Sequence, residues 1–116
     1  MSMTKEMVRE KMQEEDVIVL NVLSSEDFAK IHIKDSYNLP LAKDPVTFVS
    51  KVERLYGRYK FFITHCTNLS CTAGPAAATA LRENGFRADD YPGGIEDWAA
   101  AGYPVEGTEV SQHAVR

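Results

Sequence analysis

Strand and helix signals alternate along this chain, and the alternation limits the fold to a small number of architectures. The segment Val17–Val22 is apolar on both faces of a strand, as expected for a central strand of a parallel sheet that is covered on each side. Alternating strands and helices predict an α/β fold with a mainly parallel central sheet and helices on both faces, a three-layer arrangement.

The expected elements follow from apolar periodicity and from capping residues. Strands are predicted over residues 17–22, 36–39, 60–65 and 88–91. Helices are predicted from a cap at Thr4 to about Gln13, from a cap at Ser24 to Phe28, from Asp44-Pro45 to Gly57, over 75–84, and around 96–100. Beyond Val105 the sequence EGTEVSQHAVR shows no periodicity. We therefore expect one domain over residues 1–105 and a flexible C-terminal tail over 106–116.

Charge and hydropathy exclude two classes of partner. The 116 residues carry 13 basic and 17 acidic side chains, a net charge of -4, with no block of Lys or Arg, so no nucleic-acid partner is expected. The longest apolar run, Val17–Leu20, is too short to cross a bilayer, and the N-terminus lacks the apolar core of a secretory signal, so no membrane partner is expected. A cytoplasmic location is the resulting default. In that reducing compartment Cys66 and Cys71 are expected to be thiols and not a permanent disulfide.

The stretch THCTNLSCTAGP places Cys66 in a loop between a strand and a helix, where α/β proteins gather reactive groups. A cysteine of ordinary pKa needs about 2 kcal/mol of help to be a thiolate at neutral pH. Loop amides and the helix dipole can supply roughly 0.5–2 kcal/mol. Because residues 66–75 contain no Lys or Arg, the expected local donors are main-chain amides and the side chains of Thr67, Asn68, Ser70 and Thr72. Such donors suit a thiolate better than a dianionic phosphate, which disfavours a protein phosphatase.

Other interpretations of these residues stay open at this point. Cys66 could pack as a small hydrophobe, and Cys71 could be either core filler or a resolving partner that closes a disulfide with Cys66. His65, Cys66 and Cys71 could supply three zinc ligands, but neighbouring strand residues point to opposite faces and no fourth ligand is evident, so no metal site is predicted. His65 is expected to be a packed strand residue, His32 to fix the loop after the second helix by hydrogen bonding, and Trp98 to lie in the core.

Several segments together resemble a single rhodanese-like domain. The segment VIVLNVLSSEDFAKIHIKDSYNLPL resembles that family's first strand, short helix and histidine-containing turn, and FFITHC resembles the strand that leads to its active cysteine. AAATALRENGF followed by YPGGIEDWAAAGYPV resembles its closing section, in which Gly93 to Trp98 is the most specific piece. The similarity extends from about Val17 to Val105.

The resemblance implies a rhodanese-like three-layer fold and a sulfurtransferase or persulfide carrier. Cys66 would take up sulfane sulfur as a persulfide and pass it to a thiol or to cyanide, without a cofactor. The loop residues that would line the persulfide pocket are Thr67, Asn68, Leu69, Ser70 and Thr72. The expected partner is a small sulfur donor or thiol acceptor, or a protein persulfide.

Several departures from the family pattern qualify this expectation. Asn21 and Leu23 occupy positions where the family usually has an aspartate and an arginine. The loop after Cys66 is about two residues longer than usual, lacks basic side chains and carries Cys71. We therefore expect weak binding of thiosulfate, a dianion. The alternatives are a Cys66–Cys71 thiol–disulfide switch and a non-catalytic rhodanese-like interaction module.

Overall fold

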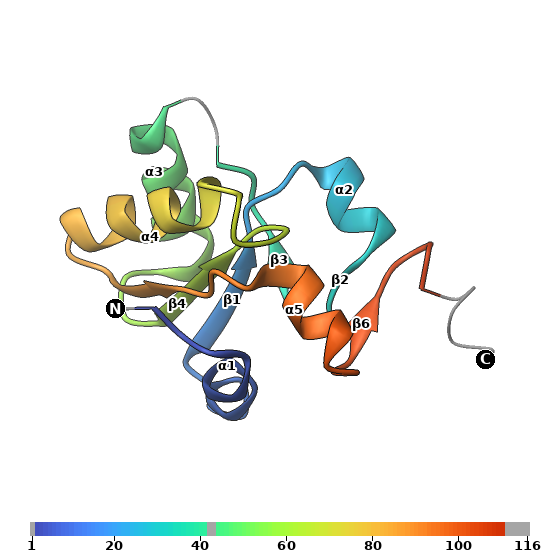
Figure 1. The fold of residues 1–116 in the computed structure, drawn as a ribbon. Coiled ribbons are helices and arrows are strands. Elements are labelled where there is room, and N and C mark those ends of the chain that lie inside the picture. Colours follow the sequence, from blue (N-terminus) through green and yellow to red (C-terminus); the bar gives the residue numbers. More distant parts are fainter. Residues whose placement is uncertain (1, 42–43, 111–116) are drawn as a thin grey trace.

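The computed structural model describes residues 2–41 and 44–110. Its main sheet is parallel and has the strand order β3-β1-β4-β5, so that β1 and β4 lie at the centre (Figure 1). The strands of this sheet are β1 (Val17–Asn21), β3 (Tyr37–Asn38), β4 (Phe61–His65) and β5 (Arg87–Asp90). The helices are α1 (Lys5–Lys11), α2 (Ser25–Lys30), α3 (Pro45–Tyr56), α4 (Ala73–Glu83) and α5 (Gly94–Ala100).

Two hydrophobic cores lie on opposite faces of the sheet, because alternate residues of a strand point to opposite sides. Ile18 and Leu20 of β1 pack in the core that contains residues of α3 and α4. Val19 of β1 packs in the other core, with Val8 of α1 and Trp98 of α5. Figure 1 shows α3 and α4 on one side of the sheet and α1 and α5 on the other. The predicted α/β architecture, with helices on both faces of a mainly parallel sheet, is confirmed.

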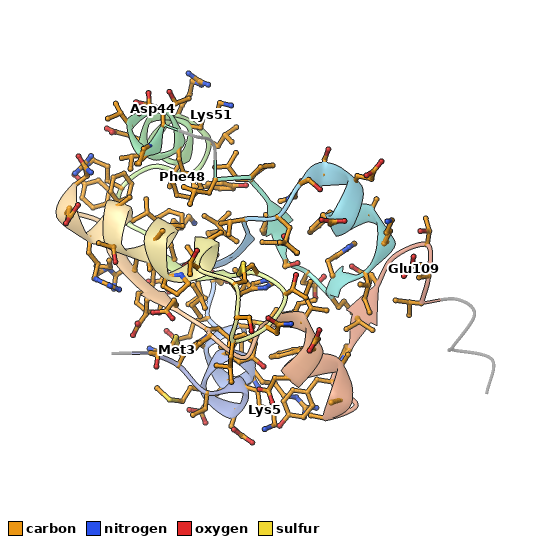
Figure 2. All side chains as sticks on the ribbon, turned by 45° about the horizontal axis from the view of Figure 1, so that its top comes forward. Met3, Lys5, Asp44, Phe48, Lys51 and Glu109 are labelled. Atoms are coloured by element: carbon orange, nitrogen blue, oxygen red, sulfur yellow. A yellow bond between two sulfur atoms is a disulfide. The ribbon has the colours of Figure 1, made fainter. Side chains whose placement is uncertain are left out.

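Buried aromatic side chains fill both cores. Phe48 on α3 is fully buried and points from its helix into the protein (Figure 2). Trp98 is 2% exposed and donates its indole N–H to Pro104 O at 2.7 Å, as expected for a core tryptophan. The His32 ring stacks on Phe28, and its Nδ1 lies 2.7 Å from Phe28 O. His32 therefore holds the segment after α2 against the helix, as predicted. Within the described residues no helix is long and apolar enough to cross a bilayer.

A small antiparallel sheet moves the C-terminal boundary of the domain. Strand β2 (His32–Ile33) pairs with β6 (Val105–Glu106), a sheet that the sequence did not predict. Further along, the amides of Thr108 and Glu109 donate to Ala29 O and Lys30 O at the end of α2. The predicted tail therefore begins too early. Residues 106–110 lie against α2 and β2, where their backbone N–H groups donate to main-chain carbonyl oxygens. The rest of the predicted tail, 111–116, lies outside the described residues.

Helix α4 begins earlier than the sequence predicted, at Ala73 instead of Pro75. A proline is tolerated in the first turn of a helix, where backbone N–H groups have no partner within the helix. Thr64 Oγ1 donates to Gly74 O at 2.7 Å, and a Cβ at position 74 would lie 3.2 Å from His65 Cα. The first turn of α4 thus packs directly on the end of β4, and this contact fixes both ends of the loop that carries Cys66.

Candidate active site

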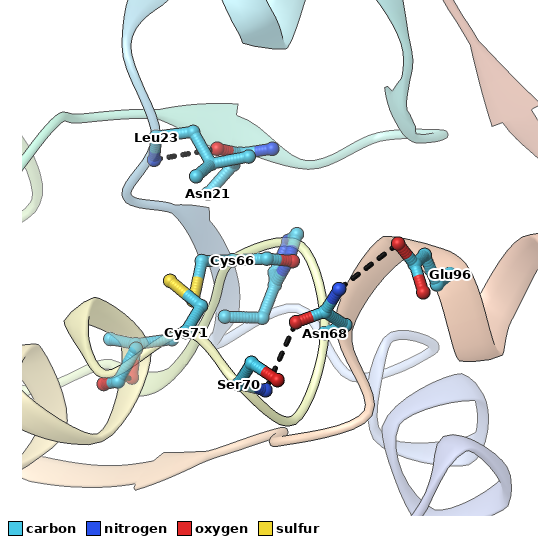
Figure 3. Close-up of a disulfide and its surroundings, with 10 residues drawn as sticks. Asn21, Leu23, Cys66, Asn68, Ser70, Cys71 and Glu96 are labelled. Carbon is cyan, nitrogen blue, oxygen red and sulfur yellow. Dashed lines mark hydrogen bonds between the residues drawn. A yellow bond between two sulfur atoms is a disulfide. The ribbon is translucent and has the colours of Figure 1, made fainter.

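Cys66 follows β4 directly and forms a disulfide with Cys71 (Figure 3). The two Cα atoms are 6.4 Å apart, within the usual range for a disulfide. Cys66 is 3% exposed and lies in the core beneath α3 and α4, whereas Cys71 is half-buried at the edge of that core. The expectation of two thiols is therefore wrong for the state described here: the loop turns back and brings both sulfur atoms together.

Asn68 is the residue that closes this turn. Its main-chain carbonyl oxygen accepts the Cys71 N–H at 3.1 Å, and its side-chain Oδ1 accepts the Ser70 N–H at 3.0 Å. Its side-chain Nδ2 donates to Glu96 Oε2 at 3.0 Å, on α5 (Figure 3). One carboxamide therefore folds the loop onto itself and ties it to a helix that is distant in sequence. The sequence did not reveal this role.

Replacing Asn68 with alanine is expected to make the disulfide easier to reduce. Both side-chain hydrogen bonds are lost, each contributing about 0.5–1.5 kcal/mol when protected from water and less at this exposed position. The equilibrium constant for disulfide formation should fall by roughly five- to ten-fold. The ratio of oxidised to reduced protein in glutathione buffers, measured by alkylation and intact mass, gives this constant. Ser70→Ala keeps the amide that Asn68 binds and should change the constant by less than about twofold; equal values for the two variants would contradict the assigned role of Asn68.

The first turn of α5 is bound to the beginning of the same loop. Ile95 N–H donates to Cys66 O at 3.1 Å, and Glu96 N–H donates to Thr67 O at 3.0 Å. Gly94 has φ +65°, and a Cβ there would lie 2.5 Å from Cys66 O. Only glycine allows the two backbones to approach this closely. The Gly93-Gly94 pair, which carries the most specific part of the family resemblance, thereby acquires a physical role.

The predicted loop residues lie together but differ in what they offer. The amides of Ser70 and Cys71 donate to Asn68, so in the disulfide form they are not aimed at the Cys66 sulfur. Leu69 is 78% exposed at the tip of the loop, and Thr72 is exposed immediately before α4. The sequence predicted that loop amides and polar side chains would assist a Cys66 thiolate, and in the disulfide form two of these amides bind Asn68 instead.

His65 lies on the opposite face of the sheet from Cys66. Its ring centroid is 6.4 Å from that of Tyr91, a member of the core next to α1 and α5. Burial lowers the pKa of His65 to about 4, so the imidazole is neutral at physiological pH. Nδ1 lies 3.2 Å from Cys66 O, which fits the tautomer that carries its proton there, and Nε2 is buried without a hydrogen-bond partner within the described residues. The prediction of a packed strand histidine is confirmed.

The described part of the chain contains no group of three or more His, Cys, Asp or Glu side chains placed to hold a metal ion. His65 and Cys66 are adjacent in sequence and pack in different cores, as neighbouring residues of a strand do.

Asn21 and Leu23, the positions of the missing ion pair, form a turn of another kind. Asn21 Oδ1 accepts the Leu23 N–H at 2.9 Å (Figure 3). Asn38 Nδ2 donates to Asn21 O at 3.1 Å and to Leu23 O at 2.9 Å. These uncharged hydrogen bonds hold the end of β1, so the local architecture does not need the ion pair.

Two clefts border the loop, and their side chains are mainly acidic or apolar. One lies between the loop tip and α5 and is lined by Asn68, Leu69, Ser70, Gly93, Glu96 and Asp97. The other, of about 370 Å³, lies between α2 and α5 and is lined by Leu23, Asp27, Lys30, Ile31, Thr67, Ile95, Glu96, Ala99 and Glu109. Lys30 is the one cationic side chain among these residues, against four carboxylates. Lys5 Nζ lies 3.7 Å from Asp97 Oδ1, which leaves three carboxylates and Lys30, so the lining of the clefts disfavours a dianion.

Comparisons with known proteins agree with the fold described above. The family model described as "Rhodanese-like domain" matches residues 4–101. The BH2092 protein from Bacillus halodurans has a similar structure, with a TM-score of 0.81 and 24% identity over 99% of this chain and 89% of that one. The rhodanese-like domain of the Alr3790 protein from Anabaena sp. has a TM-score of 0.78 and 19% identity over 96% and 82% of the two chains. A rhodanese-related protein from Thermoplasma volcanium has a TM-score of 0.69 and 24% identity over 90% and 96%. No curated protein matches the sequence significantly.

The family model covers most of the chain, and the solved structures share its sheet and helix layers. The predicted rhodanese-like fold is confirmed, and the chain belongs to the rhodanese-like domain family.

Proposed function

We propose that this domain is a sulfurtransferase or sulfur carrier in which Cys66 takes up a sulfane sulfur as a persulfide. The observation that carries the proposal is the place of Cys66, at the carboxyl end of a central strand and at the start of the loop that leads into α4. In parallel α/β sheets, reactive groups gather at the carboxyl ends of the strands. The resemblance of the sequence to the family supports the same position for a sulfur-carrying cysteine.

Main-chain dipoles support ionisation of Cys66 in the reduced protein. Residues 66–75 contain no Lys or Arg, and the groups of this segment that can stabilise a thiolate are the N-terminal end of α4 and the amides of the loop. These groups stabilise a thiolate by roughly 0.5–2 kcal/mol. Reduction of the disulfide would also free the loop to reorient the amides that now bind Asn68.

The charge around the loop favours a monoanionic or neutral sulfur donor. Thiosulfate carries two negative charges and would approach through clefts bordered by Glu96, Asp97, Asp27 and Glu109. A small persulfide, a polysulfide or a protein persulfide is the better donor, and a thiol the better acceptor. A thiol-rich, reducing compartment such as the cytoplasm suits this chemistry.

Persulfide formation is tested by intact mass after incubation of the reduced protein with glutathione persulfide or with thiosulfate. Cys71→Ser, which keeps Cys66 as the sole thiol, is expected to gain one sulfur atom from glutathione persulfide. Cys66→Ser is expected to gain none at position 66, and thiosulfate should load Cys71→Ser at least about ten-fold more slowly. Absence of the added sulfur from Cys71→Ser with both donors would refute the proposal, and fast loading from thiosulfate would refute the donor preference.

The disulfide favours a second candidate function, a thiol–disulfide switch that operates without sulfane sulfur. This function requires a Cys66–Cys71 couple with a reduction potential in the range of cytosolic thiol buffers, about -200 to -300 mV. A potential far outside that range would exclude the switch. Alkylation of both thiols no faster than a free cysteine, together with failure to load sulfur, would instead favour a non-catalytic interaction module.

A further inference from the structure

We propose that Cys71 is a second catalytic residue, which attacks the Cys66 persulfide and releases its outer sulfur as hydrosulfide. The inference rests on the proposed function, because it needs a persulfide on Cys66, and it specifies the fate of the sulfur. The domain would then act as a persulfide reductase that consumes thiols.

The loop places the two sulfur atoms so that this attack needs no partner protein. Cys66 and Cys71 are bonded to each other, and their Cα atoms are 6.4 Å apart. The hydrogen bond from Cys71 N–H to Asn68 O and the contact between Asn68 and Glu96 hold the turn in this shape. In the reduced protein the loop stays anchored at both ends, by β4 and by α4, which keeps the Cys71 thiol within reach of Cys66.

The chemical step is balanced within the loop. The Cys71 thiolate attacks Sγ of the Cys66 persulfide, a new Cys66–Cys71 sulfur–sulfur bond forms, and the bond to the outer sulfur breaks. The outer sulfur, which enters the step protonated as Cys66–S–SH, keeps its proton and leaves as HS⁻ with the bonding electron pair. The sulfane sulfur is reduced by two electrons and the cysteine pair is oxidised by two electrons, so the product is the disulfide that the structure contains.

Two observations favour release over transfer to an external acceptor. The amides of Ser70 and Cys71 bind Asn68, so they do not hold a terminal persulfide sulfur in the turn that joins the cysteines. In the disulfide form Cys66 is 3% exposed and bonded to Cys71, so at the inner sulfur Cys71 is already in place whereas an external thiol has to approach past the loop. A well-placed internal nucleophile has an effective concentration far above the millimolar level of cellular thiols, since even about 1 M would exceed it roughly a thousand-fold.

A thiol reductant completes the cycle and is expected to enter at Cys71. Cys71 is the more exposed of the two cysteines, at the edge of the core beside the exposed residues Ser70 and Thr72. Attack there forms a mixed disulfide on Cys71 and frees the Cys66 thiolate. A second thiol then releases Cys71 and forms the external disulfide, so two thiols are oxidised for each hydrosulfide produced.

A single-turnover experiment tests the inference. The full chain is reduced, freed of reductant without oxygen, and mixed with one equivalent of glutathione persulfide. Free sulfide is measured with a bimane reagent, and the protein is alkylated and weighed intact. The unsubstituted protein is expected to release about one sulfide per chain and to lose two hydrogens, so that neither cysteine is alkylated. The double variant with both cysteines changed to serine gives the background release.

Cys71→Ser separates this inference from the proposed function. It is expected to keep the added sulfur on Cys66 and to release sulfide at least about ten-fold more slowly than the unsubstituted protein. Equal release by the two proteins, or an unsubstituted protein that keeps the added sulfur while Cys71 remains alkylatable, would overturn the role of Cys71 and leave the Cys66 persulfide intact. Failure of Cys71→Ser to gain sulfur would instead refute the proposed function.

Discussion

Gly94→Ala is expected to destabilise the domain by about 3–5 kcal/mol and to abolish closure of the Cys66–Cys71 disulfide. Gly94 has φ +65°, a conformation that costs an L-residue about 1–2 kcal/mol. The new Cβ would also lie 2.5 Å from Cys66 O and 2.7 Å from the Thr67 carbonyl, both of them backbone groups that cannot rotate away. The α5 helix and the start of the loop must therefore separate, which breaks the hydrogen bonds from Ile95 and Glu96.

Gly102→Ala is the matched control for this variant. Gly102 also has a positive φ, +80°, but a Cβ there would meet no atom within 4 Å. The control reports the backbone strain alone, and we expect a loss of about 1–2 kcal/mol in the free energy of unfolding. Urea denaturation of both variants gives the difference, and alkylation gives the state of the cysteines. Equal losses would show that the close approach of Gly94 to Cys66 is unimportant.

Buried His65 is expected to make the domain less stable in mild acid. Burial lowers its pKa to about 4 in the folded protein, whereas the unfolded chain has the ordinary value of about 6.5. Between these values the unfolded state binds more protons, so stability is fully present above about pH 6.5 and is lost as the pH falls toward 4. The expected loss is about 2 kcal/mol between pH 7.5 and pH 5, and it approaches about 3 kcal/mol near pH 4.

His65→Gln isolates this contribution because it removes the titration and keeps a polar side chain. The free energy of unfolding, measured by urea denaturation from about pH 7.5 to about pH 4.5, should fall less steeply in the variant by the amount given above. The carboxyl of Asp90, whose pKa is raised by burial and by Asp89, contributes with the opposite sign and is common to both proteins. Parallel curves for the two proteins would refute a neutral buried His65.

Local signals predicted much of the fold because they act between residues that are close in sequence. The apolar run at Val17–Val22 predicted a central strand, and β1 pairs on both sides, with β3 and β4. Ser24 and Asp44 were expected to cap helices, and each accepts a backbone N–H in the first turn of its helix. The same kind of reasoning failed for β2 and β6, because these two short strands form only by pairing with each other from distant parts of the chain.

The site required contacts between segments that no local pattern connects. Asn68 binds Glu96, 28 residues away, and the Cys66 carbonyl receives the Ile95 N–H. A sequence motif pointed to Gly93-Gly94, but only the packing of α5 against the loop explains why a side chain is excluded there. Nor did any local pattern indicate that the amides of Ser70 and Cys71 would bind Asn68 in the disulfide form.

The sequence by itself determined the alternation of strands and helices, the caps that begin the helices at residues 25 and 45, and the position of Cys66 at the end of a buried strand. All of these depend on side-chain periodicity and on hydrogen bonds within a few residues. Only the tertiary structure decided that Cys71 bonds to Cys66 and that residues 106–110 belong to the domain. The path of a polar loop or chain end depends on hydrogen bonds to main-chain groups of distant segments. Because almost every residue carries the same main-chain N–H and C=O groups, the sequence does not indicate which of them will pair.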